Sequence, residues 1–453
     1  MLSPESNFGS EVLIPGGVVV FLKAACVMTM RQDGHDAPDW NTLALLGTQR
    51  DVDVVLSGGK VVAIGAGAAE PWLTAKGARV IDASRLVLMP GLVDAHNHPV
   101  FAGSRAKETV LKAQGLSYEE IASRGGGISV TTRLTRETGT DALVGIVARH
   151  AQASLSRGVV LMEAKTGYGL SPAEETRHLQ VLCKVIEASA LPESLLPRIA
   201  PTLLGPHAAS PDFRGLDAYI QALLETLPQC ADMVKPLNER GLCQPLAADI
   251  FVERNHFTKE QGEKWLGSAL GLGVDAHIHA DEFSRSGGSE LALALARRVE
   301  QTQVRKRRYG RVLSVNHCQY STEADLTKLN VMGVAAVALP STSFFSNIPY
   351  VEAMKWRASG VRIAIGTDFN PGSAPFNNIW FAAHLALTRC GFSLPEVLAG
   401  VTFNAAYALG AEDTHGRLEV GGLANLIAFE GTEPEDFFAS PLGDHLRYVV
   451  RAP

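Results

Sequence analysis

The strongest constraint on the fold is an alternation of short apolar runs with amphipathic stretches through the middle of the chain. Eight runs rich in β-branched residues recur, at residues 86–96, 159–164, 198–204, 248–252, 274–279, 312–316, 334–339 and 362–367. Helical periodicity marks most of the segments between them, at 141–157, 172–190, 216–227, 258–272, 290–299, 323–329 and 351–359. Apolar strands that alternate with amphipathic helices are typical of a parallel sheet covered by helices. Eight such units in roughly 300 residues predict an α/β fold, the (β/α)8 TIM barrel.

Both ends of the chain carry strand patterns without intervening helices. Residues 17–28, 53–56 and 60–64 predict strands, the last two joined by a Ser-Gly-Gly turn, and residues 416–429 have the same character. We expect the two ends to pair into one small β-sandwich domain beside the barrel. The predicted division gives residues 1–85 and 413–453 to the two parts of this domain and 86–412 to the barrel. Segments 33–43 and 301–310 are expected to be exposed insertions.

Composition argues against several classes of protein. A chain of 453 residues with a net charge of −6 offers no electrostatic basis for binding nucleic acid or an anionic membrane. The basic cluster at 305–311 is interpreted as a solvated loop. Six cysteines lie far apart, without a Cys-x-x-Cys pair, which is typical of free thiols in a reducing cytosol. No secretory leader and no apolar run of membrane-spanning length are apparent, so a soluble cytoplasmic protein is expected, and a homodimer stays open.

Two histidines leave the end of the first predicted strand side by side. In the segment PGLVDAHNH at residues 90–98, His96 and His98 are two positions apart, and such residues point to the same face of a strand. Two imidazoles held in this way form a pair of metal ligands. The motif is short and common, however, and by itself it would be better explained by two histidines that hydrogen-bond to the backbone.

Further polar side chains fall where the other predicted strands end. They are Tyr168, His207, Glu253, His279, Glu282, His317 and Asp368. Because the site of such a barrel lies at the carboxyl ends of its strands, these residues should converge with His96 and His98 on one pocket. The three imidazoles of His96, His98 and His279, with the carboxylate of Asp368, predict a site for one zinc or iron ion, whereas magnesium or calcium would require mostly oxygen. Catalytic zinc sites keep one position for water and lower its pKa to about 7.

Acid–base groups are expected beside this metal. Glu282, on the loop that leaves His279, is the predicted group for exchanging protons with bound water and with a leaving nitrogen. His317 and His207 are predicted to polarise a carbonyl or to balance a developing oxyanion. A purely structural role, in which the ring satisfies backbone groups, is the alternative for each of these two histidines.

Two features are expected at the mouth of the barrel. Arg105, seven residues beyond His98, is predicted to hold a substrate carboxylate by a bidentate pair. The glycine run GGGI at residues 125–128 lacks the Lys-Ser/Thr that would follow in a phosphate-binding loop, and it does not open a clear helix. We therefore expect it to form a loop.

At this point the sequence resembles the amidohydrolase superfamily, and within it the imidazolonepropionase family, from about residue 53 to residue 427. The motifs that carry the resemblance are PGLVDAHNHPVFAGSR at 90–105, SYEEI at 117–121, GGGI at 125–128, EAKTGYGL at 163–170, LGPHA at 204–208, HADE at 279–282, TDFNPGS at 367–373 and NAAYALG at 404–410. The first part of the first motif and the last motif indicate only the superfamily. The loop that contains Arg105, the KTGYG piece at 165–169 and DFNPGS at 368–373 together indicate the family.

The resemblance implies a role for each matching position. Metal ligands fall on His96, His98, His279 and Asp368, substrate contacts on Arg105, Tyr168, His207, Glu282, Asn370, Gly372 and Ser373, and a catalytic histidine on His317. The implied reaction is hydrolytic opening of the ring amide of 4-imidazolone-5-propanoate to N-formimidoyl-L-glutamate. Arg105 would take the propanoate carboxylate, and Glu282 with Asp368 would move the proton to the departing nitrogen.

Two alternatives stay open from the residues alone. One is a related amidohydrolase that deaminates a purine, pyrimidine or pterin ring, because it would share the metal ligands and differ only in the substrate contacts and the product. The other is a non-enzymatic binding protein on a retained barrel, since a fold does not by itself imply a function.

Overall fold

The computed structural model describes residues 9–30, 46–116, 120, 125–303 and 309–453. The predicted insertion at 33–43, most of the SYEEI motif and four residues of the basic cluster lie outside these ranges.

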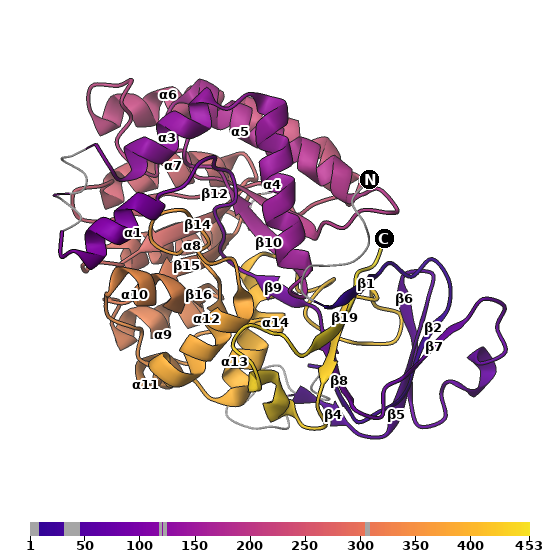
Figure 1. Ribbon diagram of the computed structural model, residues 1–453. Coiled ribbons are helices and arrows are strands. Elements are labelled where there is room, and N and C mark those ends of the chain that lie inside the picture. Colours follow the sequence, from indigo (N-terminus) through magenta and orange to yellow (C-terminus); the bar gives the residue numbers. More distant parts are fainter. Residues whose placement is uncertain (1–8, 31–45, 117–119, 121–124, 304–308) are drawn as a thin grey trace.

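The structure confirms the predicted barrel. Its parallel strands follow one another in the order β9 (Leu92–Asp94), β10 (Val159–Lys165), β11 (Arg198–Leu203), β12 (Ala247–Ala248), β14 (Asp275–Ala280), β15 (Val312–His317), β16 (Ala335–Ala338) and β17 (Ile363–Ile365), and β13 (Phe251–Val252) also pairs with β14. A parallel bridge between Asn97 and Phe369, just beyond the first and last of these strands, nearly closes the sheet. Helices surround it on the outside (Figure 1).

Seven helices correspond to the predicted amphipathic segments. They are α4 (Thr140–Leu155), α5 (Pro172–Ser189), α6 (Leu216–Glu239), α7 (Lys259–Gly271), α8 (Gly288–Gln303), α9 (Glu323–Val331) and α11 (Ala353–Ser359). Capping residues explain where α7 and α9 begin. The side chains of Thr258 and Thr322 each accept a hydrogen bond from the backbone N–H three residues further along. Further helices were not predicted: α1 (Ala106–Ala113), α3 (Ile128–Glu137), α10 (Pro340–Ser346), α12 (Ile379–Leu385), α13 (Leu394–Gly400) and α14 (Phe403–Ala408).

Three local expectations were wrong. The predicted strand at 86–96 is two strands, because β8 (Leu86–Pro90) pairs outside the barrel and only β9 belongs to it. The predicted strand at 248–252 is broken into β12 and β13 on either side of Asp249. The glycine run does open a helix: Gly127, with a φ of 79° that favours glycine, is the N-cap residue of α3.

Both ends of the chain form the small β-domain. One sheet has the order β1 (Glu11–Leu13), β19 (Leu446–Val450), β18 (Leu426–Glu430), β8, β3 (Cys26–Met28) and β4 (Thr48–Gln49), and the other has β6 (Lys60–Gly65), β5 (Val52–Ser57), β2 (Val19–Ala24) and β7 (Arg79–Asp82). Leu426 and Ala428 pack between the two sheets against Phe21 and Val54, which makes the domain a sandwich. The exact division of the chain at residues 86 and 413 stays a prediction.

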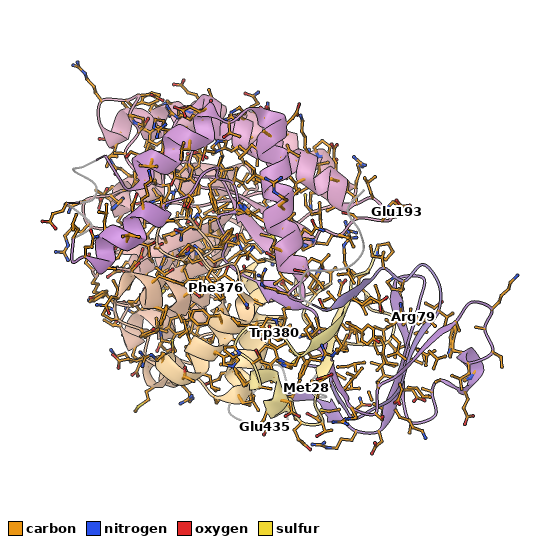
Figure 2. All side chains as sticks on the ribbon, in the orientation of Figure 1. Met28, Arg79, Glu193, Phe376, Trp380 and Glu435 are labelled. Carbon is orange, nitrogen blue, oxygen red and sulfur yellow. The ribbon has the colours of Figure 1, made fainter. Side chains whose placement is uncertain are left out.

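The small domain is joined firmly to the barrel strand that carries the first histidines. Gly91 joins β8 directly to β9. A Cβ at this position would lie 2.5 Å from the side chain of Val160, so the backbone packs against β10 too closely for any larger residue. On the other side of β18, Phe429 faces Trp380 of α12, which stacks on Phe437 at 4.2 Å between ring centroids. Figure 2 shows Trp380 where the barrel meets the β-domain. Among the described residues, the helices are all too short or too polar to cross a bilayer.

Candidate metal centre and active site

Three histidines and one aspartate converge at the carboxyl end of the barrel. His96 and His98 follow β9, His279 lies in β14 and Asp368 follows β17. The Nε2 atom of His98 lies 3.0 Å from that of His96 and 3.4 Å from that of His279. The Oδ1 atom of Asp368 lies 3.4 Å from Nε2 of His96 and 3.2 Å from Nε2 of His98. All four side chains are buried, and we call them the His3Asp cluster.

The chemistry of the His3Asp cluster fits a divalent metal ion. Burial is the main cause that lowers the pKa of His96 and of His98, so both rings are neutral near pH 7 and each offers a lone pair. Burial acts to raise the pKa of Asp368, but the two histidines lower it more, and its carboxylate is ionised. Imidazole nitrogens that lie 3.0–3.4 Å from Nε2 of His98, together with a carboxylate oxygen 3.2–3.4 Å from two of these nitrogens, form the donor set that a borderline cation such as zinc prefers.

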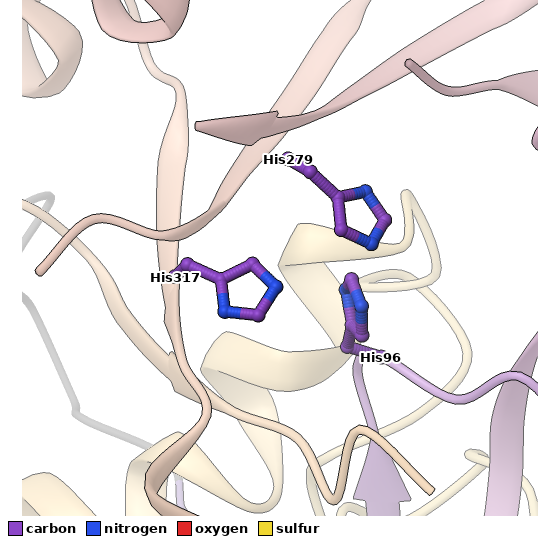
Figure 3. A group of neighbouring side chains, drawn as sticks. All are labelled: His96, His279 and His317. Atoms are coloured by element: carbon purple, nitrogen blue, oxygen red, sulfur yellow. The ribbon is translucent and has the colours of Figure 1, made fainter. Parts of the chain in front are cut away.

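His317 adjoins the same cluster. Its ring, with those of His96 and His279, offers ligand atoms within 4.8 Å of one another, as do His96, His98 and Asp368. Figure 3 shows the rings of His96, His279 and His317 pointing toward one another from three separate strand ends. His317 and Asp368 both adopt positive φ, 74° and 51°, a conformation that costs a non-glycine residue about 1 kcal/mol or more and is found mainly at functional sites.

Neighbouring side chains hold the first and last barrel strands in place. The carboxylate of Asp94 accepts hydrogen bonds from Nδ2 of Asn97 at 2.8 Å and from the backbone N–H of Thr367 at 2.9 Å. Asp94 therefore links the His-x-His segment to the strand end that carries Asp368. The hydroxyl of Thr342 donates to Oδ2 of Asp368, which leaves Oδ1 directed at the histidines.

The predicted acid–base group Glu282 lies beside His317. Its Oε2 atom is 3.5 Å from Nε2 of His317, and both side chains are buried. Burial, with the negative charges of Asp368 and Glu253, raises the pKa of Glu282 well above its usual value, so the carboxyl can hold a proton near neutrality. Burial lowers the pKa of His317 to about 3, so this ring is neutral.

His207 and Tyr168 form one wall of the site. The ring of His207 stacks on His98 at 5.4 Å between centroids, and Nδ1 lies 2.9 Å from the carbonyl oxygen of Gly167. Because a carbonyl only accepts, Nδ1 carries the proton and Nε2 is left as an acceptor. Tyr168 packs edge-on to His207 and joins a small apolar cluster with Phe101 and Phe369.

Arg105 and the turn after Asp368 lie against each other. Nε and Nη2 of Arg105 donate to Oε2 of Glu108 at 3.0 and 2.8 Å, and the backbone of Gly372 faces Nη1. The side chain of Asn370 does not point freely outward. Its Oδ1 accepts from the backbone N–H groups of Gly372 and Ser373, both at 2.8 Å, and so shapes the turn.

The structure therefore brings every predicted site residue to the carboxyl end of the barrel or to the turn beside it, but it adds three that were not predicted. Lys165, Glu163 and Asp249 are fully buried below the His3Asp cluster and are linked to it. Glu163 and Lys165 stand two positions apart in a strand, and Asp249 interrupts an apolar run. Charged residues inside apolar strands were the available signal.

Known proteins share sequence with most of this chain. The family model described as "Amidohydrolase family" matches residues 123–452. An imidazolonepropionase of Pseudomonas entomophila is 35% identical over 405 residues, which cover 88% of this chain and 93% of the relative. An imidazolonepropionase of Symbiobacterium thermophilum is 38% identical over 353 residues, which cover 77% of this chain and 76% of the relative.

Solved structures agree on the fold. A crystal structure of a triazine hydrolase variant superposes with a TM-score of 0.68, at 15% sequence identity, over 96% of this chain and 93% of that one. At this identity the likeness concerns the barrel and the small domain, and the residues of the site have to be argued from their own contacts.

Proposed function

The chain belongs to the amidohydrolase family and, within it, to the imidazolonepropionases, and from this premise we propose that it hydrolyses the ring amide of 4-imidazolone-5-propanoate. It is a hydrolase of histidine degradation that acts on a carbon–nitrogen bond of a cyclic amide. Water adds across the bond between the ring carbonyl carbon and its nitrogen. The carbon becomes the new carboxylate, the nitrogen takes the proton, and the product is N-formimidoyl-L-glutamate.

The observation that carries the proposal is the juxtaposition of the His3Asp cluster with Glu282 and His317. We assign His96, His98, His279 and Asp368 as ligands of one zinc or iron ion. In this buried setting Nε2 of His98 lies 3.0 and 3.4 Å from Nε2 of His96 and His279, and Oδ1 of Asp368 lies 3.4 and 3.2 Å from Nε2 of His96 and His98. Such an ion supplies a water of lowered pKa and polarises the carbonyl under attack.

The chain's own side chains would move the proton. Asp368, ionised and directed at the cluster, accepts it from the attacking water. Glu282, whose pKa is raised, can deliver a proton to the departing ring nitrogen. The neutral ring of His317, 3.5 Å from Glu282, is placed to donate a hydrogen bond to the oxygen that develops negative charge.

Binding would be divided between the two sides of the site. Arg105 pairs with the propanoate carboxylate while Glu108 holds its guanidinium from the opposite edge. Tyr168 and His207 line the wall against the ring, and the turn formed by Asn370, Gly372 and Ser373 offers backbone groups. The six free cysteines, five of them buried, support a location in the reducing cytoplasm.

Product analysis tests the proposal. The purified protein should consume imidazolone propanoate and yield formimidoylglutamate without release of ammonia. Ammonia released in stoichiometric amount from a purine, pyrimidine or pterin, with no consumption of imidazolone propanoate, would assign the site to a deaminase instead.

A further inference from the structure

Below the His3Asp cluster, one buried lysine joins two carboxylates. Nζ of Lys165 lies 2.6 Å from Oε1 of Glu163 and 2.7 Å from Oδ2 of Asp249. All three side chains are fully buried in the barrel interior, where removing charges from water is costly unless they are paired. The three charged side chains lie directly beneath the polar end of the barrel. Each carboxylate approaches a different histidine of the His3Asp cluster.

Asp249 contacts His279 on the ring edge that faces away from the cluster. Its Oδ2 lies 2.9 Å from Nδ1 of His279, and its Oδ1 accepts from the backbone N–H groups of Ile250 and His279 at 2.7 and 3.2 Å. The two atoms are within ion-pair distance but lack the alignment of a hydrogen bond. Because a carboxylate only accepts, the contact favours a proton on Nδ1 of His279, which leaves Nε2 with its lone pair. That Nε2 is the atom that lies 3.4 Å from His98.

Glu163 faces the corresponding edge of His96 from farther away. Its Oε1 is taken by Lys165 and by the hydroxyl of Thr202 at 2.6 Å, while its Oε2 lies 4.0 Å from Nδ1 of His96. Within the described residues, neither Oε2 of Glu163 nor Nδ1 of His96 has another hydrogen-bond partner, although both are buried. A small movement of the His96 ring would bring them into contact.

We infer that Lys165 is a positioning residue that holds Glu163 and Asp249 so that they fix the tautomer and ring orientation of His96 and His279. The inference rests on the proposed metal site, because these rings are two of its three histidines. Lys165 lies on β10 and Asp249 between β12 and β13, so one side chain ties together the strands beneath the cluster. Carboxylates that orient ligand histidines typically contribute 10–100-fold to metal affinity.

The test measures metal affinity by competition with a chelator, using the full-length protein loaded with zinc, together with its melting temperature. Lys165→Met should weaken zinc binding by roughly 10–100-fold. The control is Glu396→Gln, which removes a buried carboxylate whose recorded partners are Arg357, at 2.6 Å, and the backbone N–H of Ser393, neither of them a cluster ligand. It should lower the melting temperature and leave zinc affinity unchanged.

A second variant decides the matter if Lys165→Met fails to fold. In Asp249→Asn, an amide nitrogen that faces His279 obliges Nδ1 to accept, which moves the proton to Nε2, where it opposes metal binding. In metal-free protein, long-range ¹H–¹⁵N spectra should show His279 protonated at Nδ1 in the unmodified chain and at Nε2 in the variant.

Zinc affinity in Asp249→Asn within about threefold of the unmodified protein, with the His279 tautomer unchanged, would overturn the inference. Neither readout depends on turnover. If the unmodified protein binds zinc but leaves imidazolone propanoate intact, the proposed reaction is wrong. The zinc affinity of the variants and the tautomer of His279 still test the inference about Lys165.

Discussion

Gly372 lies so close to Arg105 that a Cβ at position 372 would stand 2.1 Å from Nη1 of the arginine. The turn after Asp368 and the guanidinium proposed to bind the substrate carboxylate are therefore fitted to each other. Glu108 holds the opposite edge of the guanidinium, so Arg105 is confined from two sides.

Gly372→Ala should displace Arg105 without unfolding the protein, because the atom that must move is the far end of a flexible side chain. We expect KM for imidazolone propanoate to rise roughly tenfold, as for weakening a charge-assisted pair, with a small change in kcat. Steady-state kinetics measure this. Gly271→Ala is the control, since a Cβ there meets nothing within 4 Å. Equal KM values in the two variants would show that Arg105 does not bind the substrate.

Glu282→Gln keeps the shape of the side chain but cannot transfer a proton. It should retain the metal and lose at least roughly a hundredfold in kcat. Metal content and rate are measured on the same preparation. A loss of less than about threefold with metal retained would exclude Glu282 as the proton carrier.

Removal of a ligand from the His3Asp cluster should abolish both metal binding and activity. About one equivalent of zinc or iron is expected to copurify, and His98→Ala or Asp368→Ala should bind none, because each change removes a donor atom. Elemental analysis and assay after exhaustive chelation check this. Full activity in protein verified as metal-free would contradict the assignment.

Glu175 should make stability depend on pH through the loop that carries Tyr168. Its carboxylate accepts from the backbone N–H groups of Gly167, Gly169 and Leu170 at 2.7–2.9 Å, and burial raises its pKa to about 7. Its folded pKa exceeds the unfolded one, so its contribution is fully present below about pH 4.5 and is lost as pH rises through 7.

Between pH 4.5 and 7 the free energy of unfolding should fall by about 3 kcal/mol because of Glu175. The unmodified protein should lose stability relative to Glu175→Gln over this range, although the variant is less stable at acid pH because it forfeits backbone hydrogen bonds. Denaturant unfolding at several pH values measures the difference. A constant difference between the two proteins would show that Glu175 titrates as an exposed carboxyl does.

The sequence by itself determined the features that follow from local periodicity and from the geometry of a parallel barrel. His96 and His98 share a face because side chains alternate along a strand, and His279 and Asp368 could be grouped with them because parallel strands present their carboxyl ends at one edge. Periodicity predicted the helical segments 258–272 and 323–329, and in the structure Thr258 and Thr322 cap the corresponding helices.

Tertiary structure alone decided which distant segments touch. Residues 86–96 are divided between two sheets because β8 pairs with β18, more than three hundred residues away. Local periodicity does not show such a distant pairing. Two further contacts join segments that are distant in the sequence: Arg105 lies against Gly372, and Lys165 pairs with Asp249. Both depend on the register with which the barrel strands pair. Charges inside apolar strands signalled that partners must exist, but only the packed barrel, where each buried charge has to be paired, determined which partners they are.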